Sequence, residues 1–214
     1  MARIILFGGH GRVAILAESI LAARDDVVTA VIRNPEHAAE IRAIGAEPLL
    51  ADVERLDVEA LAELIAGHDA VVWSAGAGGG NPARTRAVDR DAAIRTVDAA
   101  LRRGVKRYVM VSYFGSSLDH GVDPENPFFH YAEAKVAADE HLRGTALDWT
   151  VLGPSTLTSA AASGRIDTRA SESGSVSRGN VASAIAATLA DAGTIRRTIR
   201  FNDGDIPVVE ALRG

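Results

Sequence analysis

The sequence predicts a single α/β domain built on a doubly wound parallel sheet, and three observations lead to this fold class. Short apolar runs alternate with Ala-rich amphipathic segments, which is typical of β-α-β units. The 214 residues, of which 47% are hydrophobic, suffice for one sizeable core. No repeat or linker divides the chain.

Six apolar runs are the expected strands, at Arg3–Phe7, Val27–Arg33, Glu47–Ala51, Ala70–Ser74, Arg107–Ser112 and Trp149–Leu152. Each run is continuously apolar rather than alternating. This pattern indicates strands that are covered by helices on both faces of the sheet.

Helical patterns fill the intervals, at about 11–23, 35–44, 57–66, 82–103 and 128–143. Pro35 suits the first turn of a helix, and Gly45, Gly67 and Gly104 stand where helices would end.

The last third of the sequence is less regular. Residues 155–177 are rich in Ser, Ala, Gly and Thr and are predicted to form a long loop that closes over the pocket. A helix (about 179–191), a strand (about 195–201) and a short helix (about 207–212) follow. Substrate-side elements are expected at about 113–127 and 153–214.

Composition excludes several function classes. A net charge of −5 and a pI near 5.7 argue against nucleic-acid and anionic-membrane partners. Two short basic clusters, at 102–107 and 196–200, are expected to be solvated surface. With no cysteine and no metal-ligand spacing among the six histidines, no metal site is expected. The absence of a signal peptide and of an apolar run near ~20 residues predicts a cytoplasmic protein.

The turn after the first strand carries a dinucleotide-binding pattern, Gly8-x-x-Gly11-x-x-Ala14. Gly8 permits a tight turn, Gly11 lets the backbone approach a pyrophosphate, and Ala14 keeps the helix close to the sheet. Free N–H groups at the helix start then favour phosphate. The alternative is a merely structural turn. The predicted cofactor-binding residues of this segment are Gly8, Gly9, His10, Gly11, Arg12 and Val13.

The residue at the end of the second expected strand favours NADP over NAD as the cofactor. An acidic residue at its end would hold the ribose 2′-hydroxyl of NAD, whereas arginine pairs with the 2′-phosphate of NADP. The sequence has Arg33 there, and Arg12 is expected to converge with it on one phosphate. NAD stays possible, because both arginines could simply be solvated.

Two further segments are expected to line the cofactor. Asp52 and Val53 follow the third strand, where they could meet adenine. Ser74, Ala75 and Gly76 open the glycine-rich segment 74–80 after the fourth strand, where close passage of the ribose and pyrophosphate is expected. A plain flexible loop is the alternative for this segment.

The candidate chemistry lies on Tyr131 and Lys135, which share one helix face at positions i and i+4. A neighbouring ammonium would lower the pKa of the phenol and make Tyr131 a general acid or base. Ser112 ends the fifth strand and could hold a substrate oxygen, with Ser116 and Tyr113 as competitors. The alternatives are a surface Tyr–Lys pair and a serine that only caps its strand.

With these residues assembled, the sequence resembles the atypical short-chain dehydrogenases/reductases of the NAD(P)H-binding group, which includes flavin-reductase-like and NmrA-like proteins. The resemblance spans nearly the whole chain, including segments 8–14, 149–154 and 177–182. It implies a Rossmann fold, NADP or NAD, and a Ser/Tyr/Lys catalytic set at Ser112, Tyr131 and Lys135. Gly153 departs from the group, in which arginine is common before the proline.

The leading functional hypothesis is an NADPH-dependent reductase of a small carbonyl or similarly electrophilic compound. A redox-sensing NADP(H)-binding regulator without turnover is the second, because a fold alone does not decide function. An NAD-dependent epimerase or dehydratase is the third. The expected partner is a small-molecule substrate, and a monomer or homodimer is expected.

Overall fold

The computed structural model describes residues 1–78 and 80–214. The parallel strands are β1 (Arg3–Phe7), β2 (Val27–Ile32), β3 (Glu47–Leu50), β4 (Ala70–Trp73), β5 (Arg107–Val111), β6 (Asp148–Pro154) and β10 (Arg197–Asp203). All seven strands expected from the sequence are confirmed, each within two residues at either end. Gly79, in the glycine-rich segment 74–80, lies outside the described residues.

The predicted loop at 155–177 is wrong, because it contains three short strands. These are β7 (Thr156–Thr158), β8 (Arg165–Asp167) and β9 (Ser175–Ser177). Strands β7 and β9 pair with each other, while β8 pairs with β10 and with β11 (Ile206–Pro207). Three-residue strands whose partners lie elsewhere in the chain leave no local periodicity to read.

Within the described residues, the main sheet has nine strands in the order β11-β8-β10-β6-β5-β4-β1-β2-β3. The strands from β3 to β10 are parallel, and β8 and β11 add an antiparallel edge. The order reverses direction between β1 and β4, which is where open α/β sheets bind ligands. The doubly wound parallel sheet is therefore confirmed.

The helices are α1 (Ala14–Ala22), η1 (Pro35–His37), α2 (Ala38–Ala43), α3 (Val58–Ile65), α4 (Pro82–Thr85), α5 (Ala93–Arg103), α6 (Phe129–Arg143), α7 (Arg178–Ala190), η3 (Ala192–Thr194) and α8 (Val208–Ala211). Helix α1 begins at Ala14, three residues later than predicted. A π-helical segment, η2 (Arg86–Ala92), joins α4 to α5 inside the predicted helix 82–103. Such segments are frequent at functional sites.

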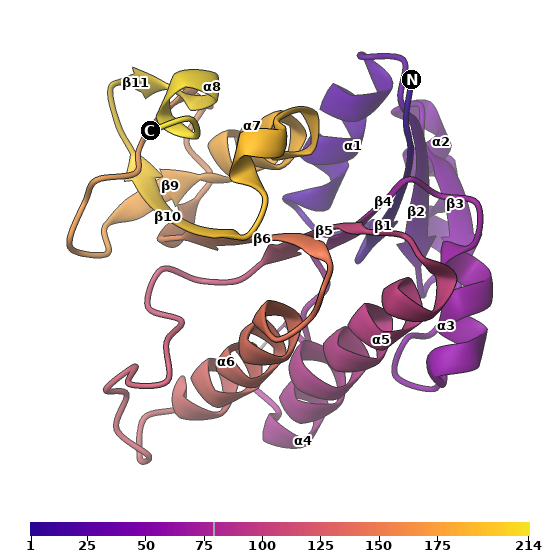
Figure 1. The fold of residues 1–214 in the computed structure, drawn as a ribbon, viewed down its shortest axis with the longest axis horizontal. Helices are drawn as coiled ribbons and strands as arrows, with labels where there is room; N and C mark the ends of the chain where they lie inside the picture. Colours follow the sequence, from indigo (N-terminus) through magenta and orange to yellow (C-terminus); the bar gives the residue numbers. More distant parts are fainter. Residues whose placement is uncertain (79) are drawn as a thin grey trace.

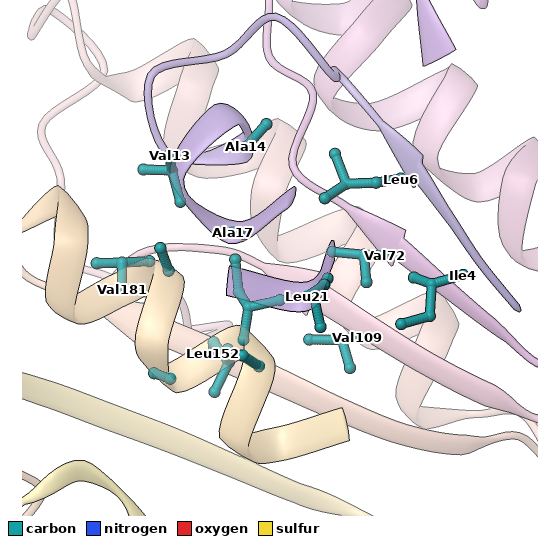
Figure 2. Close-up of a cluster of buried hydrophobic side chains, with 14 of the residues drawn as sticks. Ile4, Leu6, Val13, Ala14, Ala17, Leu21, Val72, Val109, Leu152 and Val181 are labelled. Carbon is teal, nitrogen blue, oxygen red and sulfur yellow. The ribbon is translucent and has the colours of Figure 1, made fainter. Parts of the chain in front are cut away.

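Alternate residues of each central strand enter two separate cores. Ile4 and Leu6 pack under α1, α2 and α7, whereas Ile5 and Phe7 face the side covered by α3, α5 and α6 (Figure 1). Figure 2 shows part of the first core, in which side chains of α1 gather with Val181 of α7 and with side chains of the sheet. Both faces are thus buried, as the continuous apolar runs indicate.

One of the basic residues expected on the surface is instead structural. Arg107 donates hydrogen bonds to the carbonyls of Asp148 and Thr188 and to the hydroxyls of Thr150 and Thr194. Its guanidinium therefore ties β5 and β6 to the end of α7. No helix in the described part of the chain has the length and apolarity needed to cross a bilayer.

Candidate active site

The turn between β1 and α1 has the close approaches that the glycine pattern predicts. Gly8 has φ +88°, and a Cβ built there would lie 2.6 Å from the Cα of Ala75. A Cβ on Gly11 would lie 3.0 Å from the carbonyl oxygen of Gly8. Ala14 is fully buried where α1 meets the sheet. The tight turn and the close helix packing are therefore confirmed.

This turn leaves backbone donors free for an anion. Among the described residues, no partner accepts a hydrogen bond from the N–H of Arg12 or Val13. Both groups lie just before the start of α1, where the helix dipole also favours negative charge. The backbone thus fits a pyrophosphate at this position.

A cleft of about 290 Å³ lies along the carboxyl ends of β1 to β4. Nine of the predicted cofactor-binding residues line it, namely Gly8, His10, Gly11, Arg33, Asp52, Val53, Ser74, Ala75 and Gly76. Gly9, Arg12 and Val13 do not. The cleft spans four successive strand ends and lies where the strand order reverses. Dinucleotides bind at this position in open α/β sheets.

The convergence of Arg12 and Arg33 expected from the sequence is not what the structure shows. Arg33 lines the cleft and pairs with Glu54 at 3.1 Å. Arg12 is exposed and lies near Arg178 of α7 instead, where it helps to lower the pKa of Arg178 together with partial burial. The turn directs Arg12 past the start of α1, toward α7 rather than toward the end of β2.

Four polar cleft residues were missed from the sequence: Asn34, His37, Glu54 and Arg84. Glu54 accepts hydrogen bonds from both Arg33 and Arg84, each at 3.1 Å. His37 stacks on His10 with ring centroids 3.4 Å apart. All four follow strand ends or begin a helix. Their place in the sequence was therefore the only indication that they line the cleft.

The segment expected to close over the pocket lies elsewhere. Residues 158–162 line a second cavity of about 340 Å³ together with Leu16, Arg178 and Gly179. None of them lines the cofactor cleft. Pairing of β7 with β9 holds this segment beside the start of α7.

Of the three predicted catalytic residues, Tyr131 and Lys135 lie on α6 and Ser112 follows β5, and none of them lines the cleft. Ser112 follows β5 directly and is buried, Lys135 is 1% exposed, and Tyr131 is partly buried. Lys135 Nζ donates to the carbonyl oxygen of Val111 at 2.8 Å. This bond anchors the middle of α6 to the end of β5.

Two acidic residues that the sequence reasoning missed surround this set. Asp139, one turn beyond Lys135, accepts hydrogen bonds from Ser112 and Ser116 at 2.5 Å each. Asp89 of η2 accepts from the backbone N–H of Ala77 at 3.0 Å. Burial raises the pKa of both carboxyls, and the nearby Lys135 opposes that rise.

The expected lowering of the Tyr131 pKa is contradicted. Burial raises the pKa of Tyr131, and the negative charges of Asp89 and Asp139 raise it further. Lys135 donates to the Val111 carbonyl, and its positive charge acts on the two carboxyls. It therefore does not lower the pKa of the phenol. Tyr131 is therefore a neutral phenol, fit to donate a proton rather than to accept one.

The neighbours of residue 153 explain why this position is a glycine. A Cβ at this position would lie 3.1 Å from the carbonyl oxygen of Tyr113 and 3.3 Å from Cγ of Arg200. The space that a side chain at 153 would need is thus occupied by the backbone after β5 and by an arginine from β10.

The NAD(P)H-binding family profile matches residues 8–192. The chain belongs to this family. It is 31% identical to the uncharacterized sugar epimerase YhfK of Bacillus subtilis, over 99% of both chains. Among solved structures, a Bacillus halodurans protein provisionally assigned as an NAD-dependent epimerase/dehydratase superposes with a TM-score of 0.90 and 32% identity, covering 99% of each chain.

A second solved relative is the oxidoreductase ylbE of Lactococcus lactis. It has a TM-score of 0.88 and 28% identity, and the match covers 98% of this chain and 94% of the relative. These likenesses agree with the atypical short-chain dehydrogenase/reductase group to which the sequence motifs point. The chain is thus an NAD(P)H-binding protein of an oxidoreductase- and epimerase-like family.

Proposed function

We propose that this family member is an NADPH-dependent reductase of a small carbonyl or similarly electrophilic compound. The observation that carries the proposal is the placement of Tyr131 and Lys135 on α6 and of the buried Ser112 after β5, at the carboxyl edge of the sheet that also holds the cleft. The bound cofactor supplies the hydride. This chain's residues then have to hold the cofactor, orient the carbonyl and deliver one proton.

The cofactor would be held at three places. The backbone N–H groups of Arg12 and Val13 would donate to the pyrophosphate, and Asp52 and Val53, which line the cleft, would lie at the adenine end. Arg33 stands at the end of β2, where a 2′-phosphate would lie, and no carboxylate from β2 itself competes for the ribose hydroxyl. These features favour NADPH.

The proton would come from Tyr131. A phenol is protonated across the neutral range, and an alkoxide is far more basic than a phenolate, so Tyr131 can donate to the alkoxide that forms as the carbonyl is reduced. Ser112 would orient the same oxygen. Lys135 would hold α6 against β5 and partly neutralise Asp89 and Asp139.

The test is NADPH consumption with a panel of quinones, aldehydes and ketones, for the wild type and for Tyr131→Phe. We expect the variant to bind NADPH with unchanged affinity and to lose all but about 1% of turnover. Tyr108→Phe is the matched control, because Tyr108 is a fully buried tyrosine inside the core and does not line the cleft. Equal turnover by Tyr131→Phe and the wild type would contradict the role of Tyr131.

An epimerase is the second candidate, favoured by the names of the Bacillus subtilis and Bacillus halodurans relatives. An epimerase returns the hydride to its substrate and therefore consumes no nicotinamide cofactor. Purified protein that retains NAD through gel filtration and oxidises no NADPH with any panel compound would favour the epimerase. Stoichiometric NADPH oxidation would favour the reductase.

A further inference from the structure

Arg200 is a cationic side chain without an assigned partner. It is exposed on β10, and within residues 1–78 and 80–214 it makes no ion pair or side-chain hydrogen bond. In the parallel register of β10 with β6, Arg200 pairs with Gly153. Its Cγ lies 3.3 Å from the point where a Cβ on Gly153 would stand. The side chain therefore lies across Gly153.

The same geometry directs Arg200 toward the catalytic side of the sheet. Its neighbours Ile199 and Phe201 are buried in the core under α7, so Arg200 points to the opposite face. On that face Thr198 accepts a hydrogen bond from Arg143 of α6 at 3.2 Å. Arg200 lies two residues closer than Thr198 to the carboxyl edge, where α6 begins and carries Tyr131.

A cluster of aromatic side chains lies between Arg200 and Tyr131. The ring of Tyr113 lies 5.8 Å from that of Tyr131 and 5.2 Å from that of Phe128, and Phe128 lies 5.1 Å from Tyr131. Phe128 is 42% exposed. Burial raises the pKa of Tyr113 to about 12, and the positive charge of Arg200 acts against that rise, which places the guanidinium near this ring.

The proposed proton donor thus has an apolar, aromatic surface on one side and an unpaired guanidinium beyond it. Aromatic rings offer stacking surfaces to flat conjugated groups. A guanidinium binds a carboxylate through two parallel hydrogen bonds, and it is more selective for that geometry than an ammonium.

We propose that Arg200 and the cluster of Tyr113, Phe128 and Tyr131 form the substrate subsite for a conjugated carbonyl compound that bears a carboxylate away from its reacting end. The ring system lies on the aromatic cluster, the carbonyl faces Tyr131, and the carboxylate pairs with Arg200. Arg200 is a specificity-determining residue in this arrangement. The inference rests on the proposed reductase function for the reacting end only.

The kinetic test compares 6-formyl-2-naphthoate with its methyl ester, which removes the charge and adds one methyl group. For Arg200→Gln we expect kcat/KM for the carboxylate to fall at least tenfold, mainly through KM, since a charge-assisted pair is lost. Turnover of the ester should change less than twofold. Arg102→Gln, an exposed arginine paired with Glu59 on α3, is the control and should affect neither compound.

A binding measurement separates this proposal from the reductase proposal. Calorimetry of 2-naphthoate and of the neutral 2-naphthamide, with and without NADP⁺, requires no turnover. Tighter binding of 2-naphthoate that Arg200→Gln weakens about tenfold would support the subsite, even if no aldehyde were reduced; in that case only the reductase function falls. Equal affinity of the wild type and Arg200→Gln for 2-naphthoate, or no binding to either, would overturn the subsite even if aldehydes were reduced.

Discussion

The hydroxyl of Ser112 donates a 2.5 Å hydrogen bond to Oδ2 of Asp139, and Ser116 donates to the same oxygen. While Asp139 is ionised, both serine protons point at it, so Ser112 offers only lone pairs to a substrate. Once Asp139 is protonated on this oxygen, it can donate to Ser112, whose own hydroxyl proton is then free for a carbonyl oxygen. The protonation state of Asp139 therefore sets what Ser112 can do.

We expect this coupling to appear in the pH dependence of reduction. Burial raises the pKa of Asp139, so the productive protonated form persists above the ordinary range of an aspartate. In the wild type, kcat/KM should fall by about tenfold per pH unit once Asp139 ionises. Asp139→Asn should remove this limb, because an amide donates to a serine at every pH.

The measurement is the pH–rate profile between about pH 5 and 9 for the wild type, Asp139→Asn and Glu140→Gln. Glu140 is the neighbouring carboxylate on α6 and pairs with Arg143 instead, so its variant should keep the wild-type profile. An Asp139→Asn profile that overlays the wild type would refute the link between Asp139 and Ser112.

The sequence allowed the sheet, the glycine turn and most of the cofactor cleft to be predicted, since each depends on local pattern. Continuous apolar runs mark buried strands, and Gly8 and Gly11 occur at a strand–helix junction where a Cβ would meet nearby backbone atoms. The acidic residues of the site could not be found in this way. Asp139 and Asp89 look like solvated positions on helices, and only tertiary packing brings them to Ser112 and Ala77.

The same dependence on tertiary packing explains why two predictions about charged groups were wrong, namely the lowered pKa of Tyr131 and the convergence of Arg12 with Arg33. The i, i+4 spacing of Tyr131 and Lys135 is correct, but the sequence does not show that the Val111 carbonyl and two buried carboxyls engage the ammonium. Likewise, the direction taken by Arg12 depends on how α7 packs beside α1, which is a contact between residues far apart in the chain.

Cofactor choice should depend on the pairing of Arg33 with Glu54. A 2′-phosphate has to replace Glu54 as the partner of Arg33, whereas NADH makes no such demand. Arg33→Gln should weaken NADPH binding about tenfold and NADH binding less than threefold. Glu54→Gln should strengthen NADPH binding, because it frees both Arg33 and Arg84.

Fluorescence titration of the wild type, Arg33→Gln and Glu54→Gln with NADPH and with NADH gives the six affinities. Arg55→Gln is the control, because Arg55 is adjacent but pairs with Asp52 and is largely exposed. If Arg33→Gln weakened the binding of both cofactors equally, Arg33 would not be the residue that recognises the 2′-phosphate.

Gly8 should tolerate no side chain. Gly8→Ala would place a Cβ 2.6 Å from the Cα of Ala75 in a left-handed backbone conformation. We expect a loss of about 3 kcal/mol in the free energy of unfolding, together with loss of cofactor binding. Gly67→Ala separates the two causes, since Gly67 has φ +76° but open space around its Cβ position and should cost about 1 kcal/mol. Urea unfolding of both variants measures the difference, and equal losses would show that the approach to Ala75 has no consequence.

Glu18 should make the fold less stable as pH rises. It is fully buried in α1, neither carboxyl oxygen has a hydrogen-bond partner among the described residues, and burial raises its pKa from 4.5 to about 8. The folded state thus binds the proton more tightly than the unfolded state, so stability falls as pH increases between about 4.5 and 8 and levels off above that window. The difference between these pKa values corresponds to about 5 kcal/mol.

Glu18→Gln keeps the shape of the side chain and cannot ionise. It should match the wild type near pH 4.5 and exceed it in the free energy of unfolding by about 5 kcal/mol near pH 8.5. Glu47→Gln, on an exposed glutamate of β3, should show no such divergence because its carboxyl stays in water in both states. Urea unfolding at a series of pH values checks this expectation. A constant difference between Glu18→Gln and the wild type would mean that Glu18 is already solvated or paired, and that the interface of α1 with α7 holds no uncompensated acid.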